Sequence, residues 1–239
     1  MQRACVWVVV PSLFGLVSGC GAPPPPPPPP PQPAAEAPKR EPVPAIEGDV
    51  GGMNETRTEQ TIERVTPKLV SCYQQGLTRV AYLAGEVQFA VRVAIDGSTR
   101  SAFVKATTLG DRETELCMLG VLKATSWPKP VGGEGTVESP FTFNPSGDEK
   151  PPVDWTPDKL GPAFRSAKYK LGQCKKKAGT KKKLKVTMYV DTDGTLSTAG
   201  VGSEDEKGEA AVDCVIATLK ALKFKKPGDT ASKVSVVID

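Results

Sequence analysis

The 239-residue chain contains no histidine, and aromatic residues make up only 6% of it. Without histidine it lacks the commonest general base and the side chain that activates serine and cysteine nucleophiles. Paired carboxylates remain, but Asp191 and Asp193 flank a predicted turn and 204–206 is a polar run, so both are expected to be solvated. The glycine-rich segment 132–135 lacks the Lys-Ser/Thr of a phosphate loop. We therefore expect no catalytic residue, no cofactor and no metal site.

Long apolar runs are also scarce, and the one near the N-terminus is short. It covers 4–17, follows Arg3 and closes on the sequence Val-Ser-Gly-Cys, which ends at Cys20. A charge, a short apolar core and small residues are typical of a secretory signal peptide, whereas a membrane-spanning helix needs about 20 apolar residues. The closing residues resemble the lipobox of bacterial lipoproteins. We expect a signal peptide over 1–19 and a lipid on Cys20; Gly21 in place of Asp implies, by resemblance to Gram-negative lipoproteins, a periplasm-facing position on the outer membrane.

The segment 20–55 is rich in proline, with nine consecutive prolines from Pro23 to Pro31. Such a run favours a polyproline II rod, at about 3.1 Å per residue roughly 28 Å long. Proline-rich segments also bind modules with aromatic grooves. Because this segment follows the predicted lipid directly, we interpret it as a spacer.

Beyond the spacer the sequence repeats with an offset of 97 residues. Alternating apolar residues and an Asp-Gly pair predict a strand and hairpin turn near Asp96, and a second such pair is Asp193-Gly194. The same offset relates other landmarks, so we interpret the chain as two copies of one unit. The further matches are Cys117 with Cys214, Leu122-Lys123-Ala124 with Leu219-Lys220-Ala221, Trp127 with Phe224, and Pro130 with Pro227.

Each unit has the same predicted order: an amphipathic helix, a hairpin, a second helix and a last strand at 136–143 or 233–238. We predict an α+β fold of two tandem α-β-β-α-β domains, 56–147 and 148–239, each an antiparallel three-stranded sheet with helices on one face. The apolar helix positions are Ile62, Val65, Leu69, Val70, Tyr73 and Leu77; Leu116, Leu119, Val121 and Leu122; Leu160, Phe164, Ala167, Leu171 and Cys174; and Val212, Val215, Ile216 and Leu219.

Four cysteines remain after Cys20, and the closest two are 40 residues apart. Structural zinc sites usually draw ligands from close pairs, so the spacing disfavours zinc. An even number in an exported chain predicts disulfides, with three possible connectivities. Each unit has one cysteine on each predicted helix, and two helices on one sheet face are neighbours. The repeat therefore predicts the pairs Cys72–Cys117 and Cys174–Cys214.

Motif residues in the first unit carry a family resemblance. They are Gly85, Val87, Phe89, Val91, Asp96, Gly97, Trp127, Pro128 and Pro130, together with Cys72-Tyr73, Leu83, Ile95, Thr107-Thr108-Leu109, Cys117, Gly132-Gly133 and Pro140-Phe141-Thr142-Phe143. This pattern resembles the C-terminal domain of TonB, and especially the TonB-like domains that end the gliding-motility proteins AgmX and PglI. The resemblance covers about 55–145. The second unit keeps the skeleton but lacks the Tyr after its Cys, the Trp and the glycine pair.

The resemblance implies protein–protein contact in the periplasm. In TonB the last strand offers an edge to which a partner peptide adds as a further strand, through main-chain hydrogen bonds. TonB is anchored by a transmembrane helix coupled to a motor, and a lipid cannot take over that coupling. Pro140 removes a backbone donor from the first unit's last strand. The candidate partner-binding strand is therefore Lys233, Val234, Ser235, Val236, Val237 and Ile238, unless that edge is merely solvated.

Positive charge is concentrated in the second unit. Residues 150–239 contain 18 Lys and Arg against 11 Asp and Glu, while 59–147 has 9 of each. Much of the excess forms a basic patch, for which anionic lipid, wall polymer or an acidic protein are candidate partners; a solvated lysine loop is the alternative. Its members are Lys175, Lys176, Lys177, Lys181, Lys182, Lys183 and Lys185.

These patterns together predict a lipid-anchored, non-enzymatic adaptor that binds an unidentified envelope protein. The alternative is a module that binds cell wall or another anionic surface through the basic patch. Nucleic acid is not an expected partner of an exported chain.

Overall fold

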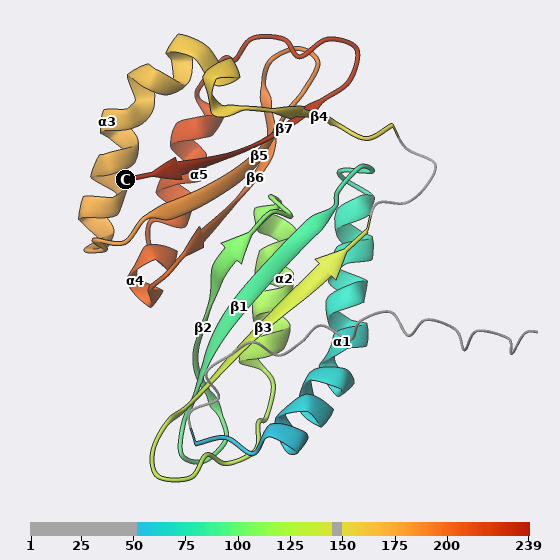
Figure 1. Cartoon of the computed structure of the whole chain (residues 1–239), viewed down its shortest axis with the longest axis vertical. Coiled ribbons are helices and arrows are strands. Elements are labelled where there is room, and N and C mark those ends of the chain that lie inside the picture. Colours follow the sequence, from blue (N-terminus) through green and yellow to red (C-terminus); the bar gives the residue numbers. More distant parts are fainter. Residues whose placement is uncertain (1–51, 145–149) are drawn as a thin grey trace, which may run out of the picture. The chain divides into compact units, whose positions relative to one another are not determined.

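The computed structural model describes residues 52–144 and 150–239 (Figure 1). Two hydrophobic cores form among these residues, one for each copy of the repeat. We call residues 55–143 the first module and 153–238 the second module. The predicted signal peptide, Cys20 and most of the proline-rich spacer lie outside the described residues.

The first module has the predicted order of elements. Asn54 caps its first helix by accepting a hydrogen bond from the Arg57 backbone N–H, and Asp111 caps the second in the same way from Thr114. The strands form an antiparallel sheet in the order β2-β1-β3, with both helices on one face (Figure 1). The elements are α1 (Glu55–Leu77), β1 (Gly85–Val93), β2 (Thr99–Thr107), α2 (Arg112–Lys123) and β3 (Gly135–Phe143).

The second module repeats this order but adds a strand, β4, a 3-10 helix, η1, and a short helix, α4. Its sheet has the order β4-β7-β5-β6, and β4 runs parallel to β7. The prediction of a three-stranded antiparallel sheet is therefore wrong for this module, because the chain entering it pairs with the edge of β7. The elements are β4 (Val153–Trp155), η1 (Pro157–Leu160), α3 (Gly161–Ala178), β5 (Leu184–Val190), β6 (Leu196–Ser203), α4 (Glu206–Glu209), α5 (Val212–Lys220) and β7 (Ser232–Ile238).

The helices bury most of the predicted apolar positions. All of those on α3 and α5 are buried, but Val70 on α1 and Leu116 on α2 are 37% and 46% exposed. Met118 is fully buried and Glu115 occupies an inward position, so the buried face of α2 is rotated from the predicted one.

Both disulfides join the two helices of one module. Cys72 on α1 is bonded to Cys117 on α2, and Cys174 on α3 to Cys214 on α5, with Cα atoms 5.7 and 5.6 Å apart. This is the connectivity that the repeat predicts. Each bond closes a loop across the small core of its module.

The modules meet where β6 packs against β2, and glycine makes this contact possible. A Cβ atom on Gly202 would lie 2.7 Å from Cα of Ala106 and 2.9 Å from the Lys105 carbonyl oxygen. A Cβ on Gly200 would collide with the Glu115 carboxylate. The backbones therefore approach more closely than any other residue would allow.

Buried polar groups complete the contact between the modules. The Thr187 hydroxyl donates to the Thr107 carbonyl at 3.0 Å, and the Tyr189 hydroxyl donates to the Ala84 carbonyl at 3.1 Å. Tyr189 is completely buried and belongs to the core of the first module although it lies on β5. Burial raises the pKa of its hydroxyl. The second module thus contributes a side chain to the core of the first.

Glu115 on α2 is the most deeply buried carboxylate of this contact. Its Oε1 accepts a hydrogen bond of 2.6 Å from the Thr107 hydroxyl, while Oε2 has no partner among the described residues. Burial raises its pKa to about 7; Asp111 and Glu209 add to the rise, and the Thr107 hydrogen bond and Arg112 oppose it. The ionised form is therefore unfavourable in the folded chain.

Glu115→Gln is expected to stabilise the protein at high pH. The cost of burying the ionised carboxylate is absent below the ordinary pKa of 4.5, grows as the pH rises towards about 7, and is complete above that. We expect Glu115→Gln to raise the free energy of unfolding by about 1–2 kcal/mol at pH 8 and to leave it almost unchanged at pH 4.5. Urea unfolding at both pH values measures it, with exposed Glu63→Gln as the control. An equal effect at the two pH values would contradict the prediction.

Candidate functional site

The predicted partner-binding strand β7 has a partly covered edge. β4 pairs with its first residues, placing Val153 beside Ser232, Asp154 beside Lys233 and Trp155 beside Val234. The prediction that Lys233 and Val234 lie on an open edge is therefore wrong. The three-residue strand that covers them is too short to give a periodic signal in the sequence.

The rest of β7 has an open edge. The Val153 N–H donates to the Ala231 carbonyl, so the main-chain groups of Ala231 point away from β5. Because pointing alternates along a strand, the N–H and C=O of Ser235 and Val237 point the same way, while Val236 and Ile238 bond to β5. No described strand pairs with this side of Ser235 or Val237. The open edge thus offers two residues with free donors and acceptors.

The side chains of β7 fall into two sets. Val234, Val236 and Ile238 are buried in the core of the second module. Lys233 is half-buried: its Nζ donates to the Ala84 carbonyl at 2.6 Å and lies 5.4 Å from the centroid of the Tyr189 ring. Burial lowers its pKa. Lys233 therefore helps to join the modules. Ser235 and Val237 are both exposed, but the Ser235 hydroxyl shares a hydrogen bond of 2.7 Å with the Thr187 hydroxyl, which leaves Val237, 48% exposed, to meet a partner.

A groove of about 350 Å³ lies beside this open edge. Both modules contribute to it, so neither copy of the repeat could form it alone. Two of the three lysines in its lining are paired with carboxylates, Lys183 with Asp239 at 3.1 Å and Lys105 with Glu138. Its lining residues are Gln88, Lys105, Ala106, Lys183, Lys185, Gly202, Glu204, Val237 and Asp239.

Sequence reasoning missed the contribution of the first module to this groove. Gln88, Lys105 and Ala106 carry no motif. Two glycines spaced by one residue within β6, Gly200 and Gly202, are the signal that could have been used, because glycine inside a strand often marks close approach of another backbone.

The predicted basic patch is only partly a surface feature. Lys175 is buried, and its Nζ lies 3.4 Å from the Ile238 carbonyl, so its inclusion in the patch was wrong. The lysine at that position packs along the core and reaches the end of β7. The other six members are exposed: Lys176, Lys177, Lys181, Lys182, Lys183 and Lys185.

The other open edge belongs to β3, and proline blunts it. The Glu86 carbonyl accepts from the N–H groups of Thr108 and Leu109, so Glu86 and every second residue along β1 point towards β2. Gln88, the neighbour of Pro140, is one of these. Pro140 therefore faces outward, and the donor that it lacks is missing from the outer edge of β3.

The remaining candidates from the sequence have structural roles. Asp193 accepts hydrogen bonds from the Thr195 N–H and hydroxyl in the β5–β6 turn, which lower its pKa to about 2. Asp205 caps α4, accepting from the Gly208 N–H. Glu134, in the glycine-rich segment, pairs with Arg92 and Arg100. None of these carboxylates is arranged as an acid–base pair.

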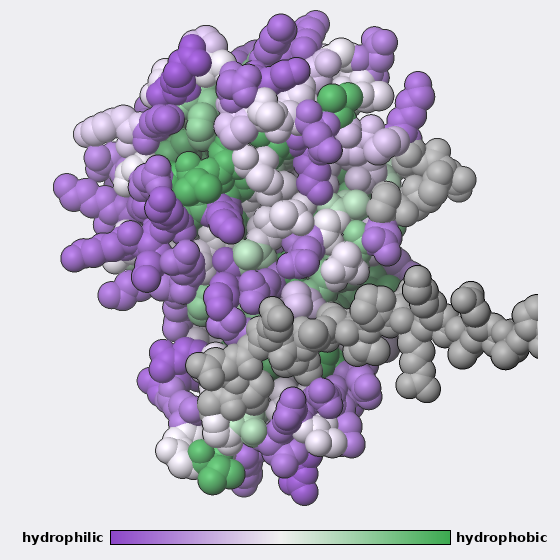
Figure 2. Space-filling model, in the orientation of Figure 1, coloured by the Kyte–Doolittle hydropathy of each residue, from purple (hydrophilic) through white to green (hydrophobic). Residues whose placement is uncertain are grey.

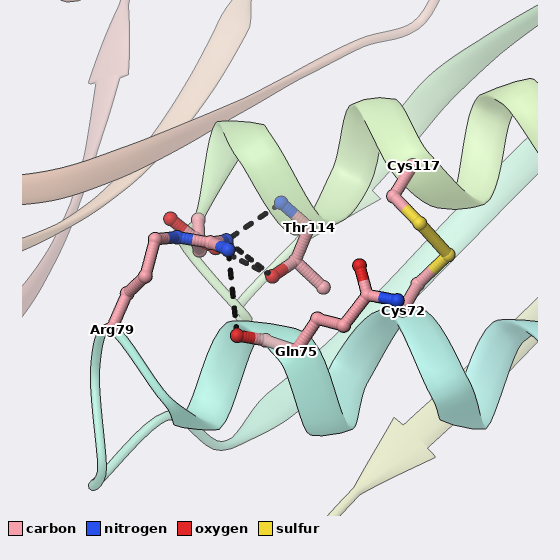
Figure 3. Close-up of a disulfide and its surroundings, with 6 residues drawn as sticks. Cys72, Gln75, Arg79, Thr114 and Cys117 are labelled. Atoms are coloured by element: carbon pink, nitrogen blue, oxygen red, sulfur yellow. Dashed lines mark hydrogen bonds and ion pairs between the residues drawn. A yellow bond between two sulfur atoms is a disulfide. The ribbon is translucent and has the colours of Figure 1, made fainter.

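The surroundings of the first disulfide contain a further polar cluster (Figure 3). Arg79 projects from the end of α1 towards α2, where its guanidinium donates to Asp111 at 2.7 Å and to the Thr114 hydroxyl at 3.2 Å. Asp111 also accepts from Thr198 of the second module at 2.6 Å. Each charge in this cluster is already paired, so it holds the modules together rather than presenting a free binding group.

No group of three or more potential metal ligands occurs within 52–144 and 150–239, and no helix there is long and apolar enough to cross a bilayer. No protein-family model matches the chain, and no curated protein matches its sequence.

Proposed function

We propose that this protein is a lipid-anchored periplasmic adaptor, non-enzymatic, that binds an envelope protein by strand addition to β7. The observation that carries the proposal is the pair of open main-chain positions, Ser235 and Val237, beside a groove that both modules form. Exposed strand edges of this kind bind extended peptides through main-chain hydrogen bonds.

The modules are proposed to be TonB-like. Each has a helix, a hairpin, a second helix and a last strand, in the order that the motif residues of the first unit predict. The proposed site departs from the family pattern because β4 occupies part of the edge. A partner strand would therefore pair with the part of β7 that β4 leaves open, and one of its side chains would lie beside Val237.

The proposed anchor is a lipid on Cys20 in the outer membrane. The segment between Cys20 and the first described residue, Gly52, would hold the modules away from the bilayer, and its nine consecutive prolines would span about 28 Å as a polyproline II rod. A lipid cannot take over the motor coupling of TonB, so we propose that the adaptor acts by bringing its partner to the membrane.

Val237→Pro tests the proposed edge directly. It removes one outward N–H and leaves the bonds of β7 to β5 in place, so we expect at least a tenfold loss of a partner captured from envelope extracts. The bait is the chain from Gly21 to Asp239, which contains every described element. Val237→Ala keeps the donor and is expected to lose less than threefold.

A matched proline on the other edge separates the two strands. Thr142 lies on β3 two residues beyond Pro140 and also faces outward, so Thr142→Pro is expected to leave capture unchanged. Equal losses from Thr142→Pro and Val237→Pro, or no captured protein at any salt concentration, would overturn the proposed function.

A further inference from the structure

The outer face of α3 carries positive charge without any negative charge. Arg165, Lys168, Lys170, Lys176 and Lys177 are all exposed, and α3 contains no Asp or Glu. None of the five forms an ion pair within the part of the chain that the structure describes. Hydrophilic side chains project from the surface around α3 (Figure 2). The helix is about 27 Å long at 1.5 Å per residue, so the cations span an extended strip.

The stability of the helix does not account for these cations. Lysines in the last turn, such as Lys176 and Lys177, complement the negative end of the helix dipole. Arg165, Lys168 and Lys170 lie in the first ten residues of α3, where the dipole gives cations no advantage. Their charge is therefore available for an external partner.

The corresponding helix of the first module shows that the fold does not need this charge. Aligning the two modules on Cys72 and Cys174 places Glu63 opposite Arg165, and Gln74 and Gln75 opposite Lys176 and Lys177. The acidic and basic residues of α1 are equal in number: Glu55, Glu59 and Glu63 against Arg57, Arg64 and Lys68. The basic face is thus a property of the second module alone.

An aromatic side chain stands within the basic strip. Tyr169 is 76% exposed, and it lies one turn after Arg165 and two turns before Lys176, on the same side of the helix. Tyrosine combined with lysine and arginine is typical of surfaces that rest at the headgroup level of a bilayer, where the ring meets the acyl boundary and the cations meet phosphates.

We propose that the outer face of α3 docks on an anionic membrane surface through phosphate-bearing lipid headgroups. The choice of a membrane over a soluble polyanion rests on Tyr169 and on the proposed tethering at Cys20, and so in part on the proposed function. The contact itself needs neither the lipid on Cys20 nor the edge of β7. It would fix the orientation of the tethered modules instead of anchoring them.

Co-sedimentation with vesicles tests this docking. The chain from Gly21 to Asp239, without lipid, is mixed with vesicles of phosphatidylethanolamine and phosphatidylglycerol at 3:1, or of phosphatidylcholine alone. The chain is expected to bind the anionic vesicles at 50 mM salt, and its affinity is expected to fall at least tenfold at 500 mM salt. No binding to the phosphatidylcholine vesicles is expected. Changing all five α3 cations to Gln is expected to lower the affinity at least tenfold, and Tyr169→Ser about threefold.

A charge-matched control distinguishes α3 from net charge. Changing five exposed cations outside α3 to Gln removes the same charge, and we expect less than a threefold effect; they are Arg57, Lys68, Lys123, Lys129 and Lys150. Equal losses in the two variants, or an unchanged affinity for Tyr169→Ser combined with equal binding to a soluble polyphosphate, would overturn the proposed membrane contact. Val237→Pro is expected to leave vesicle binding intact, so the failure of either proposal can be recognised separately.

Discussion

Replacing both Cys174 and Cys214 by alanine is expected to lower the free energy of unfolding by about 4 kcal/mol. The disulfide restricts the unfolded chain, and a loop of this length regains about that much conformational entropy when the bond is removed. The bond spans 40 residues and joins the two helices that cover the sheet of the second module. Cys174 is buried and Cys214 is exposed, so alanine leaves only a small cavity at one end. The double substitution avoids an unpaired thiol.

The two described tryptophans allow each module to be followed separately. Trp127 is buried in the first core and Trp155 in the second. In the chain from Gly21 to Asp239 with Trp127→Phe, Trp155 is the remaining tryptophan, so guanidinium unfolding followed by tryptophan emission reports on the second module. The control is chemical reduction of the parent protein, which removes the same bond together with Cys72–Cys117. A loss below about 1 kcal/mol in the double variant would contradict the prediction.

Gly202→Val is expected to lower the free energy of unfolding by about 3 kcal/mol and to make the two modules unfold separately. The added Cβ meets the main chain of Ala106 and Lys105, which cannot move aside as a flexible side chain would. The two backbones must separate, and separation exposes Tyr189 and the carboxylate of Glu115 to water. The transitions seen by Trp127 and by Trp155, which should coincide in the parent protein, are then expected to occur at different denaturant concentrations.

Gly120→Val is the matched control. Gly120 is an exposed position on α2 where an added Cβ meets no atom within 4 Å. We expect its effect on the free energy of unfolding to stay within about 0.5 kcal/mol. If Gly202→Val behaved like Gly120→Val, the close approach of β6 to β2 would not be a feature of the folded protein in solution.

Much of the fold could be predicted because the same sequence pattern occurs twice in the chain. The offset between Asp96 and Asp193 located both hairpins, and the position of one cysteine on each helix decided the disulfide pairing. Core positions on α3 and α5 followed from spacings of three and four. Such periodic signals depend only on local geometry, which the sequence records directly.

The parts that could not be predicted depend on contacts between distant segments. β4 forms because Val153 and its neighbours meet β7, and nothing in three residues distinguishes a strand from a loop. Glu115 lies on the inward side of α2 because Thr107 and the second module enclose it, although a carboxylate ordinarily marks an outward position. Lys175 differs from Lys176 and Lys177 only in its angle around α3.

The covering of β7 by β4 affects whether copies of the protein can associate with each other. A long, uninterrupted strand edge is a template on which copies of the same chain can assemble, and attachment to a membrane raises the local concentration of copies. Here β4 and Pro140 each remove part of an edge, and β2 and β6 shield one another. On β7 only two positions stay open, so copies are expected to gain little from pairing with each other along this strand. If the chain is anchored as proposed, crowding on the bilayer is therefore not expected to drive copies to assemble through β7.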